Sequence, residues 1–256
     1  MIIRNEQLAA VREHGLERFR RELAARVRSY APEIASIVGE TGVRQIVLRA
    51  MERSRQHQFE KAGPIQLYLE LMLSFGSDFD TDPAIPWAKE FLIGTEFDQM
   101  ERAGGLYAAA SRYLEEVAGP NNRFALAACG RAAEVLTNSP DLHGTDLDGA
   151  IVRGMNDIYP EKSMRAGEGA LLTLVAKAKI VGAAYSVTGP EGLALLAGLL
   201  FGFGHGVVGD PAYPWIVRTL ADVNVVGVED RVARLQKKVM VYASQILKNH
   251  GSPPNA

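Results

Sequence analysis

Apolar residues recur three or four positions apart along most of this chain, with charged residues between them. The spacing predicts an amphipathic helix over residues 8–30, ended by Pro32, and a second helix over 43–51. Residues 65–73 partly alternate as a strand would, but their Leu, Met and Glu content favours a helix that ends at Gly76. Further helices are predicted over residues 86–93 and 97–117.

The second half of the chain repeats the first, with Pro32 aligned on Pro160. When residues 32–92 are slid onto 160–220 without gaps, 16 of the 61 pairs are identical. Unrelated sequences of ordinary composition would match at roughly 6% of positions, or about 4 pairs. Both tryptophans of the protein, Trp87 and Trp215, fall at the same position of the repeat. We therefore predict an all-α fold, a tandem duplication of a multi-helix unit of about 128 residues whose helices pack as a bundle.

The clearest linker in the chain is the sequence Gly-Pro-Asn-Asn at residues 119–122. We expect two domains, with residues 1–120 as the first helical repeat unit and residues 121–256 as the second. Beyond the tryptophans, a shift of one more residue aligns Arg102 with Arg231.

A short Asp-Pro-Ala-x-Pro-Trp element is the best-matched part of the two units. Asp accepts hydrogen bonds from backbone N–H groups at a turn, and Pro suits the first turn of a helix because it fixes φ and lacks a donor. The Trp ring is expected to bury against the preceding helix. We predict a structural corner, since a duplicated corner is more common than a duplicated active site. Its residues are Asp82, Pro83, Pro86 and Trp87 in the first unit, and Asp210, Pro211, Pro214 and Trp215 in the second.

The composition and net charge of the chain argue against several classes of function. The 256 residues are 47% hydrophobic with a net charge of -2, so a large core is expected and a basic nucleic-acid footprint is not. Arginines such as Arg49 and Arg53 are predicted on the solvent face of their helix. The single cysteine, Cys129, excludes a disulfide within the chain and indicates a reducing compartment. The first residues lack the features of a signal peptide, and we expect a cytoplasmic protein.

Three alternating aspartates, Asp78, Asp80 and Asp82, resemble the start of a calcium-binding loop. Such a loop needs a glycine at its sixth position and a glutamate at its twelfth, where this chain has Pro83 and Lys89. We therefore predict a loop with solvated carboxylates.

No other motif indicates chemistry. The five histidines show no metal-ligand spacing, and no phosphate-binding loop or serine-hydrolase motif occurs. Asp146 is predicted to begin a helix. A Cys–His pair formed only in space stays open. The sequence therefore predicts no catalytic, cofactor-binding or metal-binding residue.

Residues 192–209 carry no formal charge with neutral histidine, and Gly198 and Gly202 form a small-xxx-small pair. This length, about 18 residues, is at the lower edge of a bilayer span. The equivalent segment of the first unit, residues 64–81, carries Glu70 and two aspartates and cannot cross a membrane. We therefore expect residues 192–209 to form the buried central helix of the second unit, with a partner-binding groove and membrane insertion as the alternatives.

Two stretches of the first half carry a family resemblance. They are MIIRNEQ at residues 1–7 and LMLSFGSDFDTDP at residues 71–83, closing on Pro86-Trp87-Ala88. Over roughly the first 95 residues, the chain resembles uncharacterised helical proteins encoded in bacterial type VI secretion loci, beside effectors and spike components. The resemblance supplies no catalytic residues.

The resemblance and the duplicated scaffold together suggest a non-enzymatic accessory protein, a chaperone or adaptor for a secreted effector or spike component of a type VI secretion system. We expect a protein partner and no cofactor, nucleic acid or membrane. The alternative functions are a secreted toxic effector that acts on membranes through residues 192–209, and an immunity protein. A metabolic enzyme with an unfamiliar helical site is a further alternative.

Overall fold

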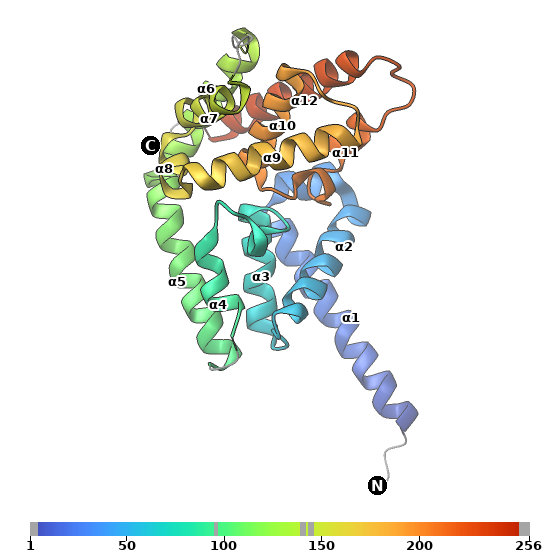
Figure 1. The fold of residues 1–256 in the computed structure, drawn as a ribbon. Coiled ribbons are helices and arrows are strands. Elements are labelled where there is room, and N and C mark those ends of the chain that lie inside the picture. The colour runs from blue at the N-terminus through green and yellow to red at the C-terminus, as the bar shows by residue number, and fades with distance from the viewer. Residues whose placement is uncertain (1–4, 95–96, 139–141, 143–145, 251–256) are drawn as a thin grey trace, which may run out of the picture.

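The computed structural model describes residues 5–94, 97–138, 142 and 146–250. These residues form α-helices and short 3-10 helices and contain no strand, which confirms the all-α prediction. Figure 1 shows the helices of the first half below those of the second half. The N-terminal part of α1 extends away from the other helices (Figure 1).

The helices of the first half begin and end where proline, glycine and capping residues allow it. Pro32 is the first residue of α2, Gly39 kinks this helix with φ 65°, and Pro86 begins η2. The Asp98 side chain caps α5 by accepting from the Met100 N–H. The elements are α1 (Asn5–Tyr30), α2 (Pro32–Gln56), α3 (Ala62–Phe75), η1 (Phe79–Thr81), η2 (Pro86–Ala88), α4 (Lys89–Leu92) and α5 (Gln99–Val117).

The second half uses similar signals. Asp146 caps α7 by accepting from the Gly149 N–H, as its predicted role at a helix start requires, and Pro214 begins α11. The elements are η3 (Pro120–Asn122), α6 (Arg123–Asn138), α7 (Leu147–Ile158), α8 (Pro160–Ala166), α9 (Glu168–Ala184), α10 (Pro190–Phe203), η4 (Val207–Gly209), α11 (Pro214–Leu220) and α12 (Val228–His250).

Several elements of the two halves have bounds at equivalent positions of the sequence repeat. The shift that aligns Pro32 with Pro160 relates α3 to α10, η1 to η4, and the segment from η2 through α4 to α11. Glycines with positive φ also correspond, at Gly39 and Gly167 and at Gly76 and Gly204. One difference stands out, because α1 is one continuous helix whereas α6 and α7 are separate helices. Descent of the halves from one duplicated unit stays a prediction.

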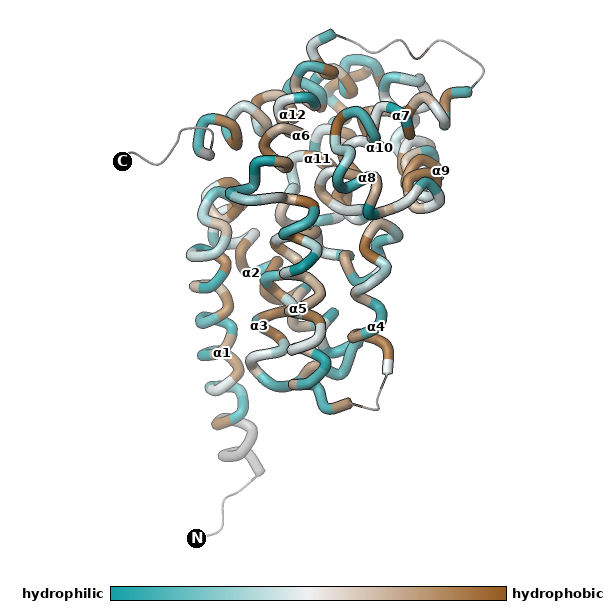
Figure 2. Tube along the Cα trace, turned by 90° about the vertical axis from the view of Figure 1, so that its left-hand side faces the viewer, coloured by the Kyte–Doolittle hydropathy of each residue, from teal (hydrophilic) through white to brown (hydrophobic). Residues whose placement is uncertain are grey.

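The buried apolar residues of both halves form one continuous core. It includes Tyr68 and Leu69 of α3 together with Leu196 and Leu200 of α10. In Figure 2, apolar positions recur along the helices of both halves. Residues 192–203 of the uncharged segment lie in the buried helix α10, as expected, but the helix ends at Phe203 and the remaining residues continue into the η4 loop. Among the described helices, none combines the length and the apolar character needed to cross a membrane.

Candidate functional site at the junction of the two halves

The ends of α3 and α10 meet at two glycines. Gly76 and Gly204 have φ values of 95° and 97°, which place both residues in the region that favours glycine. A Cβ added to Gly76 would lie 2.5 Å from the Phe203 carbonyl oxygen, and a Cβ on Gly204 would lie 2.4 Å from that of Phe75. The two chain segments can therefore approach this closely only because both residues lack side chains.

Two buried aspartates then join the halves reciprocally. Asp82 accepts from the backbone N–H of Ala84 in its own half at 2.8 Å and from that of His205 in the other half at 2.9 Å. Asp210 makes the corresponding pair of bonds, to Ala212 at 2.8 Å and to Ser77 at 2.8 Å. Burial raises the pKa of Asp210, although the N–H donors partly oppose this effect.

The rest of each corner packs through its aromatic rings. Trp87 lies edge-on to Phe75 of α3 with 5.9 Å between ring centroids, and its centroid is 5.5 Å from that of Tyr113 on α5. In the second half, Trp215 lies 6.1 Å from Tyr242 of α12. In each half, two prolines lie between the aspartate and the tryptophan. They are Pro83 and Pro86 in the first half, and Pro211 and Pro214 in the second. Each corner tryptophan therefore packs against aromatic rings from other helices of its own half.

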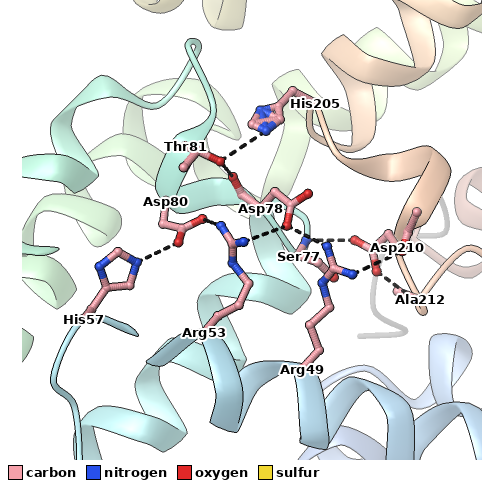
Figure 3. A network of polar contacts seen from close by, with 11 residues as sticks. Arg49, Arg53, His57, Ser77, Asp78, Asp80, Thr81, His205, Asp210 and Ala212 are labelled. Carbon is pink, nitrogen blue, oxygen red and sulfur yellow. Dashed lines mark hydrogen bonds and ion pairs between the residues drawn. The ribbon is translucent and has the colours of Figure 1, made fainter. Parts of the chain in front are cut away.

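A charged network surrounds the corner of the first half (Figure 3). Arg53 of α2 bonds to Asp80, and the Asp80 carboxylate also lies 2.7 Å from His57 Nε2. Arg49, one turn earlier on α2, donates to Asp78 at 2.7 Å. Burial alone would raise the pKa of Asp80, but the hydrogen bonds from His57 and Arg53 outweigh this effect and lower it to about 2. Asp80 is therefore a buried carboxylate held in its charged form.

The prediction of solvated carboxylates in this loop is wrong for Asp80 and Asp82, which are both buried. The Asp80 carboxylate is bonded to the Arg53 and His57 side chains, and the Asp82 carboxylate accepts hydrogen bonds from backbone N–H groups. Arg53 likewise lies partly under the loop, instead of on an open solvent face. The sequence did contain a signal for these ion pairs. Arg49 and Arg53 lie four positions apart and so share one helix face, and three aspartates alternate at residues 78, 80 and 82.

The ion pairs of this network lie within the first half, and two further contacts connect the network to the second half. Lys177 and Val181 of α9 stand at the positions equivalent to Arg49 and Arg53. Across the junction, Arg49 donates to the Gly209 carbonyl at 3.4 Å, and Thr81 lies 3.3 Å from His205 Nε2. These contacts add to the reciprocal aspartate bonds between the halves.

The contacts of this arrangement hold the two halves together. A His–Asp pair acts in hydrolases when a nucleophilic hydroxyl or thiol lies against the other ring nitrogen. Among the described residues, no Ser, Thr or Cys side chain is hydrogen-bonded to His57. Within the same part of the chain, no group of three His, Cys, Asp or Glu side chains is placed to bind a metal ion.

Two open hollows lie away from this junction. One, of about 700 Å³, lies between α7, α8 and α9, and its lining includes Asp146, Asp148, Glu168, Met164 and Leu172. The other, of about 670 Å³, lies between α12 and the loop that precedes it. We name the first one the α7–α9 groove.

The fold and the junction define an all-α protein in which two helical halves share one core and exchange carboxylate bonds across a glycine contact. Comparison with family models, curated proteins and solved structures finds no match to this chain.

Proposed function

We propose that this chain is a non-enzymatic accessory protein of a type VI secretion system, built from two copies of one helical unit. Its role is that of a chaperone or adaptor in the cytoplasm that holds a secreted effector or spike component. The N-terminal resemblance supports the secretion context. The junction supports a scaffold role, because the hydrogen bonds of its buried aspartates are used between the two halves.

The observation that carries the proposal is the α7–α9 groove. Met164 projects there with 85% of its surface exposed, and Leu172 is also exposed. The lining is of mixed charge, because Asp146 pairs with Arg153, which also lines the groove, and Asp148 pairs with Lys179. An amphipathic helix matches this lining, since its apolar side chains cover the methionine and leucine.

The test is a pull-down of the tagged full-length chain from cells that carry its native gene neighbourhood. We expect it to recover the effector or spike component encoded nearby. Met164→Asp should reduce that recovery at least tenfold, because it places a charge where the partner's apolar face packs. The matched control is Val223→Asp, since Val223 is 86% exposed and lies outside the lining of the groove.

Recovery of no neighbouring gene product by the wild-type chain would overturn the accessory role. Equal recovery by Met164→Asp and wild type would show that the partner binds elsewhere. Expression of the chain alone in a susceptible host tests the effector alternative, and loss of membrane potential there would favour it over the accessory role.

A further inference from the structure

The hydrogen bonds between the two halves form a reciprocal set. Under the shift that aligns the halves, Asp82 corresponds to Asp210, and Ser77 corresponds to His205. Asp82 accepts from the His205 N–H, and Asp210 accepts from the Ser77 N–H, at 2.9 and 2.8 Å. Each half therefore presents an equivalent donor and an equivalent acceptor to the other half. This pattern is typical of the two-fold interface between identical subunits, in which residue i contacts residue j and j contacts i.

Residues at the centre of the junction contact their own counterparts. Gly76 corresponds to Gly204, and a Cβ added to either residue would lie 3.4 Å from the Cα of the other. Asp78 corresponds to Gly206, and a Cβ added to Gly206 would lie 2.9 Å from the Asp78 Cβ. Contacts between equivalent residues occur where an interface crosses its two-fold axis. The junction is therefore an approximately two-fold interface contained within one chain.

The contacts of the junction do not depend on the linker at residues 119–122. Figure 3 shows the bonds from Ser77 to Asp210 and from Thr81 to His205, each of which joins segments far from the linker in sequence. The apolar core is likewise formed by side chains from both halves. The second half of another copy of this chain presents the same bonding groups and the same apolar surface to the first half.

The linker itself is held in a strained turn. Gly119, Asn121 and Asn122 all have positive φ, of 72°, 53° and 59°. Asparagine tolerates this region better than most residues, but each asparagine there still costs conformational energy relative to an ordinary backbone. An extended linker relieves that cost and separates the two halves of one chain. Short strained linkers of this kind favour the exchange of the segments that they join.

We propose that two copies of this chain form a dimer by exchanging halves through the junction. The first half of each copy then packs on the second half of the other, with both linkers extended. The closed chain and the exchanged dimer contain the same junction contacts, so the linker and the protein concentration decide between them. The closed chain is favoured in dilute solution because the linker holds its halves close together, and the dimer is favoured as the concentration rises.

The first test changes the linker of the full-length chain. The protein is unfolded in urea and refolded over a range of concentrations, and its mass is measured by light scattering. We expect 27.8 kDa in dilute solution and twice that mass in concentrated solution. The double variant Asn121→Val, Asn122→Val should raise the dimerisation constant about tenfold or more, because a β-branched residue is strained at positive φ. The matched control is Asn121→Gly, Asn122→Gly, which should leave the constant unchanged or lower it, because glycine adopts positive φ freely.

The second test shows whether the junction joins two chains. Separately purified Asp78→Cys and Gly206→Cys chains, both with Cys129→Ala, are refolded together at high concentration and mildly oxidised. The exchanged dimer brings the two thiols together, because the Cβ positions lie 2.9 Å apart and a small widening gives the roughly 3.5–4.5 Å of a disulfide. A covalent dimer should therefore appear on a non-reducing denaturing gel. A mixture of Asp78→Cys and Asp157→Cys is the matched control and should give none, since Asp157 is exposed on α7.

A wild-type chain that stays at 27.8 kDa at every concentration would overturn the inference. A dimerisation constant that is equal in the valine and glycine variants, or cross-linking that is equal in the two mixtures, would overturn it as well. The inference rests on the junction and not on the secretion role. Failure of either is distinguishable, because the closed chain presents the same α7–α9 groove to a partner.

Discussion

At the scale of single residues, the junction depends on which groups bond to its buried carboxylates. Asp80 is buried yet charged, because Arg53 and His57 both bond to it. Asp82 and Asp210 are instead satisfied by backbone N–H groups from both halves. The same residue type is therefore stabilised in two different ways within one site.

The stabilisation by Asp80 should depend on pH. Its pKa is about 2 in the folded protein against an ordinary value of 3.8, so its contribution is complete above pH 4 and is lost as the pH falls towards 2. The difference corresponds to about 2 kcal/mol of unfolding free energy. Urea unfolding from pH 2 to pH 7 should therefore show Asp80→Asn closer to wild type at pH 2 than at pH 7, by about that amount.

The control for this measurement is Asp157→Asn, which replaces an exposed carboxylate on α7. It should follow the wild-type pH profile throughout. A constant difference between Asp80→Asn and wild type at every pH would contradict the assigned role of Asp80.

At the scale of elements, helix periodicity and proline positions predicted most of the helices. The stripe over 43–51 indicated only part of α2, because this helix continues back through the kink at Gly39 to Pro32. The ambiguous segment 65–73 is helical, and α3 ends before Gly76 as predicted. Local patterns decide these features because helix formation is governed by neighbours three and four positions away.

The end of α10 offers a test at this scale. Gly204→Ala should lower the free energy of unfolding by about 2–3 kcal/mol, because Gly204 combines positive φ with a 2.4 Å approach to the Phe75 carbonyl. Gly202→Ala is the control inside the same helix, where a Cβ meets no atom within 4 Å. It should leave stability unchanged or raise it by up to about 1 kcal/mol. Equal losses in urea unfolding would contradict the proposed glycine contact.

At the scale of the whole molecule, the two halves share a core and exchange hydrogen bonds, so we expect them to unfold together. Each half contains one tryptophan. Trp215→Phe leaves a fluorescence reporter in the first half, and Trp87→Phe leaves one in the second. Within each variant, the midpoint by fluorescence should equal the midpoint by far-ultraviolet circular dichroism.

Comparison within one variant removes the effect of the substitution on overall stability. A fluorescence transition that precedes or follows the loss of helix in either variant would show that one half unfolds separately, and would make residues 1–120 and 121–256 independent domains.

The sequence by itself determined the all-α class and most helix positions, and it aligned one half on the other, whereas the structural role of the eight corner residues stays a prediction. These features follow from short-range periodicity, from proline and glycine geometry, and from comparison of the chain with itself. Only the tertiary structure decided that Asp82 and Asp210 bond across the halves and that Asp80 is buried between Arg53 and His57. The physical reason is distance along the chain, because bonds between residues in different halves leave no local pattern in the sequence.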